Sequence, residues 1–175
     1  MKTLVLRVND ALYSACIWIA GLSILAMSLI IPWGIFARYV LGTGSSWPEP
    51  VAILLMVVFT FVGAAASYRA GAHMAVGMVV DRLPMPLHKA AALLVQLLML
   101  GVCLYMTYYG TRLCMTTWNQ FLASLPGVRV GMTYAPIPIG GVLTLIFVLE
   151  KLILGDQSQR KVVRFDLVEE NEGAA

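Results

Sequence analysis

The sequence predicts an all-α integral membrane protein that crosses a bilayer four times. Of its 175 residues, 60% are apolar by type and 12% are charged, whereas soluble domains are about a quarter charged and at most half apolar. Four stretches contain no Asp, Glu, Lys or Arg, and each is about as long as the roughly 20 residues that cross a hydrocarbon core. They lie between Asp10 and Arg38, between Glu49 and Arg69, between Lys89 and Arg112, and between Arg129 and Glu150. Since one charge at a helix centre costs about 2.5–3.5 kcal/mol on insertion scales, these stretches indicate membrane helices, not a soluble core.

The first predicted span covers residues 11–39. It follows Asn9 and Asp10, whose side chains can cap a helix start, and Pro32 is expected to bend it. A cleavable secretory signal is the alternative, because Lys2 precedes an apolar stretch. That stretch is too long for the apolar region of such a signal, and no clean small-x-small cleavage site follows it, so we expect the span to be retained.

The second predicted span covers residues 51–68, after Pro48 and Pro50, which suit a helix start, and it ends at Arg69. Residues 70–83 are too polar to cross the membrane and too apolar for a free loop. We therefore expect them to form a segment in the membrane interface. The polar side chains of this segment are those of His73, Asp81 and Arg82.

The third predicted span covers residues 87–117, which exceeds one bilayer core and implies tilt or projection into water. An aromatic belt marks its far end, formed by Tyr105, Tyr108, Tyr109 and Trp118. The fourth span covers residues 134–154, with two prolines in its first turns. We expect residues 1–155 to form one membrane domain and residues 156–175 to form a polar cytoplasmic tail.

The distribution of Lys and Arg predicts that both termini face the cytoplasm. With this orientation nine of these residues lie in inner segments and three in outer segments, which is the positive-inside bias. The inner ones are Lys2, Arg7, Arg69, Arg82, Lys89, Lys151, Arg160, Lys161 and Arg164, and the outer ones are Arg38, Arg112 and Arg129. No basic run resembles a nucleic-acid patch.

The predicted spans have no ionisable residue near their centres. A carrier that couples transport to ions or protons normally needs such groups at mid-membrane. The deepest polar side chains are ordinary helix-packing groups: Ser23, Ser28, Thr60, Gln96 and Thr144. The cysteines Cys16, Cys103 and Cys114 are interpreted as small apolar packing residues. The chain is therefore expected to be a supporting subunit with neither a catalytic site nor a cofactor of its own.

Two other classes of protein were weighed against this interpretation. A membrane-anchored redox subunit would hold haem between His73 and His88, which are fifteen residues apart near one membrane face. A small exporter acting as a homodimer would need an acidic residue at mid-membrane, and the predicted spans contain none.

Several residues are candidates for assembly or interface contacts: Arg38 at the end of the first span, and others along and beside the second span. Glu49 can be a helix-start acid and Trp47 a belt residue, or both can dock a partner. Arg69 can be a positive-inside anchor, a partner for another subunit, or both. Gly63 and Ser67 form a small-x-x-x-small step that permits close helix contact, as does the pair Gly140 and Gly141. His73 is interpreted as an interfacial polar contact.

Four features, in this order, are similar to the small membrane subunit of tripartite ATP-independent periplasmic (TRAP) transporters. They are the Arg38-Tyr39 end of the first span, the Trp47-Pro48-Glu49 start of the second, the run from Gly63 to Arg69, and His73-Met74 four residues after Arg69. The resemblance covers about residues 12–154. Pro50 stands where the family often has a second acid.

The resemblance implies a role in a complex of the bacterial inner membrane. In such systems a periplasmic protein captures an organic acid, and a large membrane subunit carries it inward with a sodium gradient. The small subunit packs against the static scaffold of the large one and contributes to the periplasmic docking surface. The resemblance also places sodium coupling in the large partner, which agrees with the absence of ionisable groups at mid-span.

Overall fold

The computed structural model describes residues 2–43, 46–71, 85–125 and 127–155, and every extended regular element in them is a helix. Four spans are long and apolar enough to cross a membrane, which confirms the predicted all-α membrane fold. The helices are α1 (Lys2–Tyr39), α2 (Pro48–Arg69), α4 (Met85–Thr116), α5 (Val130–Tyr134) and α6 (Pro136–Leu154).

Helix α1 begins at Lys2, nine residues before the predicted start at Ala11. Asn9 and Asp10 therefore lie inside the helix, and the prediction that they cap its start is wrong. The seven residues from Lys2 to Val8 contain neither glycine nor proline, so nothing in them stops the helix. Pro32 does not end the helix either, and α1 continues to Tyr39.

The later spans start or end at prolines and glycines. Pro48 opens α2, as predicted, and Glu49 lies in its first turn, where the helix dipole favours an acid. A short helix, α5, precedes the predicted fourth span, and it is separated from α6 at Ala135, because Pro136 has no backbone N–H to continue the hydrogen-bond series. The predicted interfacial segment (apart from residues 70 and 71) and the predicted tail lie outside the described residues.

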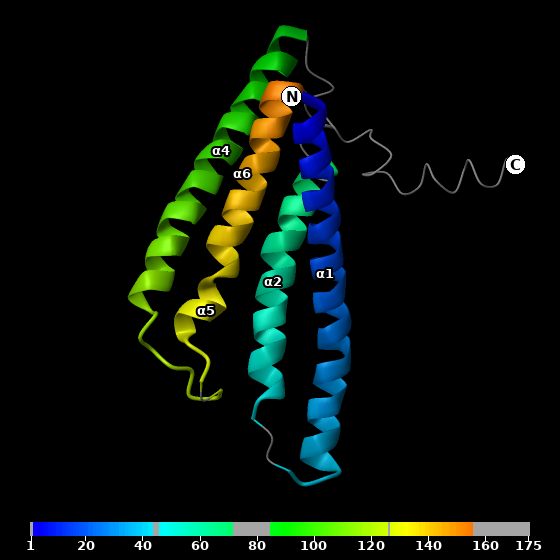
Figure 1. The fold of residues 1–175 in the computed structure, drawn as a ribbon, viewed down its shortest axis with the longest axis vertical. Coiled ribbons are helices and arrows are strands. Elements are labelled where there is room, and N and C mark those ends of the chain that lie inside the picture. Colours follow the sequence, from blue (N-terminus) through cyan, green and yellow to red (C-terminus); the bar gives the residue numbers. More distant parts are fainter. Residues whose placement is uncertain (1, 44–45, 72–84, 126, 156–175) are drawn as a thin grey trace, which may run out of the picture.

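The long helices stand side by side in one row in the order α1, α2, α6, α4 (Figure 1). Helix α2 contacts α1 and α6, and α4 contacts α6. A core cluster joins all four helices. Its buried members are Tyr13, Cys16, Val62, Ala65, Ala66, Tyr68, Cys103, Phe147 and Val148.

The two ends of the helices, which lie at opposite membrane faces, carry different residues. We call the end that holds Asp10, Arg69 and Glu150 the Arg69 end, and the end that holds Arg38, Glu49 and the 117–129 connection the Glu49 end. Between 11% and 28% of the residues in the most apolar window of each span are buried within the chain. Most of the helix surface is therefore left for lipid or for another protein.

Candidate functional site

At the Arg69 end, one arginine binds carboxylates from two other helices. Arg69, the last residue of α2, donates from Nε and Nη2 to the two oxygens of Glu150 on α6, each at 2.9 Å. Its Nη2 also donates to Oδ1 of Asp10 on α1 at 2.7 Å. The side chains of Arg69 and Glu150 are each 2% exposed and that of Asp10 is 16% exposed. This network joins three helices by charge-assisted bonds, one pair of them bidentate.

Aromatic rings enclose the Arg69 guanidinium. Its Cζ lies 5.4 Å from the ring centroid of Tyr13 and 5.4 Å from that of Phe147. These ring faces favour a cation and exclude water, so the charges interact in a low local dielectric. Within the part of the chain that the structure describes, Nη1 of Arg69 has no hydrogen-bond partner. The Arg69 network therefore holds α1, α2 and α6 together, and it suits a structural role better than a chemical one.

Arg69 was a candidate from its sequence position, whereas its two acidic partners were not predicted. From the sequence, Arg69 could anchor the chain, bind another subunit, or do both, and in the structure it binds Asp10 and Glu150 of its own chain. From the sequence, Asp10 was interpreted as a helix cap and Glu150 only as the boundary of a charge-free stretch. A signal was nevertheless present: each is an acid at the same predicted membrane face as Arg69.

At the Glu49 end, Arg38 and Glu49 form a loose ion pair. Nη2 of Arg38, near the end of α1, lies 4.0 Å from Oε2 of Glu49 at the start of α2, and their side chains are 57% and 76% exposed. Trp47 occupies the N-cap position of α2 without a capping side-chain hydrogen bond and is exposed. The fold thus brings together three of the residues named from the sequence.

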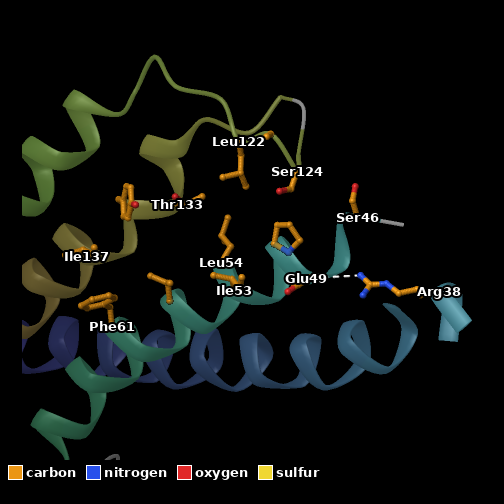
Figure 2. A pocket seen from close by; sticks show the side chains of 14 residues that line it. Arg38, Ser46, Glu49, Ile53, Leu54, Phe61, Leu122, Ser124, Thr133 and Ile137 are labelled. Atoms are coloured by element: carbon orange, nitrogen blue, oxygen red, sulfur yellow. Dashed lines mark ion pairs between the residues drawn. The ribbon is translucent and has the colours of Figure 1, made fainter. Parts of the chain in front are cut away.

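Two cavities flank this ion pair. The larger, of about 820 Å³, lies between α2, the 120–125 connection and the α5–α6 junction (Figure 2). In Figure 2, Leu122 and Ser124 face α2 across this space, and Phe61 lies at its deep end. The smaller, of about 430 Å³, lies between α1 and α2. Arg38, Glu49 and Ile53 line both cavities.

The small residues named from the sequence fall into two groups. A Cβ added to Gly63 would meet Ala20 of α1 at 3.9 Å, whereas Ser67 is exposed, so the two do not act as one face. A Cβ on Gly140 would lie 2.7 Å from Cβ of Phe61 on α2, and one on Gly141 would lie 2.8 Å from Oγ1 of Thr107 on α4. The glycine pair of α6 therefore permits close contacts with both neighbours within this chain.

The two histidines add nothing to the site as described. His73 lies outside the described residues, and the side chain of His88 is likewise outside them. The proposed interfacial role of His73 stays a prediction.

The geometry defines the class of protein first: a multi-pass α-helical membrane protein whose only described buried charges link its own helices. The chain belongs to the family of tripartite ATP-independent periplasmic transporters, DctQ component, because the family model matches residues 27–157. This agrees with the resemblance stated from its motifs and makes the chain a small permease subunit of a TRAP transporter in a bacterial inner membrane.

Three relatives carry similar names. The chain is 28% identical over 159 residues to a putative TRAP transporter small permease protein of Haemophilus influenzae, with 87% of this chain and 92% of the relative covered. It is 26% identical over 148 residues to the sialic acid TRAP transporter small permease protein SiaQ of Vibrio cholerae, covering 79% and 83%. It is 23% identical over 128 residues to the ectoine TRAP transporter small permease protein TeaB of Halomonas elongata, covering 72% and 66%.

Proposed function

We propose that this small permease subunit braces the scaffold of a large, sodium-coupled membrane subunit during uptake of an organic acid. The observation that carries the proposal is the open row of helices. Because at most 28% of the residues in each span's most apolar window are buried within the chain, a broad lateral surface is left for a protein partner. Membrane helices associate through van der Waals packing of such apolar surfaces.

The chain's own charges favour a structural role over an ion-binding one. Among the described residues, the buried acid Glu150 and the partly buried acid Asp10 both bind Arg69, which favours a structural role for them over the binding of a coupling ion. We propose that sodium binds in the large partner and that this chain holds neither a cofactor nor a catalytic site.

The Glu49 end is the proposed periplasmic side. The excess of Lys and Arg at the opposite end favours placing both termini in the cytoplasm. With this orientation, Arg38, Trp47 and Glu49 face the periplasm and contribute to the surface on which the substrate-binding protein docks.

Uptake by defined combinations of subunits tests the bracing role. Cells that produce the large subunit and the binding protein should take up labelled organic acid only when this chain is also produced. A matched strain would carry the chain with Arg112→Gln, an exposed residue of α4, and should transport normally. Uptake by this chain without the large subunit would overturn the proposal.

The roles of Glu49 and Arg69 need a separate test. We expect Glu49→Gln and Arg69→Gln to lower the yield of the purified complex without altering the dependence of uptake on sodium concentration. A changed sodium dependence in a complex that forms at full yield would show that Glu49 contributes to ion binding, contrary to the proposal.

A further inference from the structure

The two cavities at the Glu49 end open on either side of one ridge. On α2 the exposed residues follow each other at intervals of three and four, so they form one stripe along the helix: Glu49, Ile53, Met56, Thr60, Ala64 and Ser67. Glu49 and Ile53, at the start of this stripe, line both cavities. The smaller cavity extends from the ridge toward α1, and the larger extends toward α5 and α6.

Both cavities reach about as deep as one leaflet. The larger is lined on α2 from Glu49 to Phe61, and the smaller on α1 from Met27 to Tyr39. From the first to the last residue, each range rises through twelve residue steps, or about 18 Å at 1.5 Å per step. Half of a hydrocarbon core of about 30 Å is about 15 Å. Trp33, Tyr39 and Trp47 are all exposed at this end, as expected of an aromatic belt at the membrane interface.

The walls below the ion pair are apolar. Ile31, Ile35 and Met56 line the smaller cavity, and Leu54, Val57 and Phe61 line the larger. An apolar space in a membrane protein that stays empty loses dispersion contacts along its whole lining. Flexible hydrocarbon chains can fill two irregular spaces of about 820 and 430 Å³ without a matched shape.

The charges at the shared mouth supply the specificity. Arg38 and Glu49 are 4.0 Å apart and more than half exposed, so neither saturates the other. The guanidinium can donate to a phosphate, for which its planar fork is suited. The carboxylate accepts hydrogen bonds and attracts a cation, and it repels a headgroup that carries only negative charge. A primary ammonium donates such bonds, whereas a quaternary ammonium has no N–H to donate.

From these observations we propose that the Glu49 end binds one two-chain phospholipid whose headgroup combines a phosphate with a primary ammonium. The phosphate lies on Arg38 and the ammonium on Glu49, with one acyl chain in each cavity on either side of the Glu49–Ile53 ridge. The site is complete within this chain, so the proposal does not depend on the bracing role.

Lipid titration of the purified chain tests the headgroup contacts. Phosphatidylethanolamine, phosphatidylcholine and phosphatidylglycerol with identical acyl chains are added to the chain in detergent, and bound lipid is measured by native mass spectrometry. We expect phosphatidylethanolamine to bind about tenfold more tightly than the other two, the factor that corresponds to about 1.4 kcal/mol. Equal binding of the three lipids would overturn the proposal.

Three variants of the protein separate recognition of the lipid headgroup from burial of the acyl chains. Arg38→Gln combined with Glu49→Gln should remove the preference for phosphatidylethanolamine. Arg112→Gln changes an exposed arginine of α4 at the Glu49 end and should keep that preference. Ile35 is exposed and lines the smaller cavity. Ile35→Trp should therefore weaken the binding of all three lipids by the same factor and leave the preference intact. A preference that survives in the double variant would show that the ion pair is not the headgroup site.

Photocrosslinking in the whole complex tests which molecule occupies the cavities. A photoreactive amino acid at Ile53, produced in the assembled transporter, should capture a phospholipid. Capture of a peptide from the large subunit instead would assign the cavities to a protein contact and overturn the proposal.

Discussion

Charged side chains are buried and paired at the Arg69 end of the helices but exposed and loosely paired at the Glu49 end. At the Arg69 end, a guanidinium is held at 2.7–2.9 Å by two carboxylates, and the side chains of Arg69 and Glu150 are each 2% exposed. At the Glu49 end, Arg38 and Glu49 are 4.0 Å apart and largely exposed, beside two cavities.

This difference indicates a division of labour within the small subunit. The Arg69 end pairs its charged groups with one another across α1, α2 and α6, so it fixes how these three helices meet. The Glu49 end leaves charges and apolar walls available to other molecules. The first end is therefore expected to determine stability, and the second to determine what the subunit binds.

Removal of Arg69 should have the largest effect. Arg69→Ala leaves Asp10 and Glu150 without their shared cation, and breaking a buried pair costs about 3–5 kcal/mol. Unfolding of the purified chain by denaturing detergent measures the loss. A triple variant with Arg69→Met, Asp10→Leu and Glu150→Leu should recover most of it, because no buried charge is left unpaired. A loss below about 1 kcal/mol for Arg69→Ala would refute the contrast between the ends.

A methyl group at Gly140 should have the next largest effect. Its Cβ would lie 2.7 Å from Cβ and 3.0 Å from the backbone oxygen of Phe61, so α2 and α6 would have to separate. We expect Gly140→Ala to cost about 1–3 kcal/mol in the same assay. Gly101→Ala in α4 is the matched control, because nothing lies within 4 Å of its added Cβ, and it should be neutral or slightly stabilising. Equal effects at the two glycines would contradict the close α2–α6 contact.

Removal of Arg38 should have the smallest effect on stability. Exposed ion pairs contribute about 0–1 kcal/mol, and this pair is at the limit of the distance for one. Arg38→Ala should therefore unfold within about 1 kcal/mol of the unchanged chain in lipid-free detergent. A loss as large as that of Arg69→Ala would show that the Glu49 end also holds the fold together.

The sequence was sufficient to predict that the chain has four membrane spans, but not which helix packs against which. Four charge-free stretches predicted four membrane helices, because a charged residue is costly at the centre of a membrane helix whatever that helix packs against. The order α1, α2, α6, α4 could not be predicted, since helices that are apolar on all sides carry no polar face to indicate which side meets a neighbour.

Only some residues of the candidate site could be predicted, because pairings between distant helices depend on how the helices are arranged. Arg38, Trp47 and Glu49 were named from the sequence and lie around a single connection, so their proximity follows from the chain itself, and their role in assembly stays a prediction. The Arg69 network was not predicted, because Glu150 is 81 residues from Arg69 in sequence and the pairing depends on the fold. The cap assigned to Asp10 was wrong because α1 extends to Lys2.

The order of synthesis gives the Arg69 network a further consequence. Asp10 and Arg69 leave the ribosome early, whereas Glu150 follows Arg69 by 81 residues, or about 4–16 seconds at 5–20 residues per second. During that interval the guanidinium of the first hairpin has one of its two counter-ions. The fourth span therefore supplies the bidentate carboxylate that completes the Arg69 network, and a nascent chain interrupted before residue 150 should be a preferred substrate for membrane proteases.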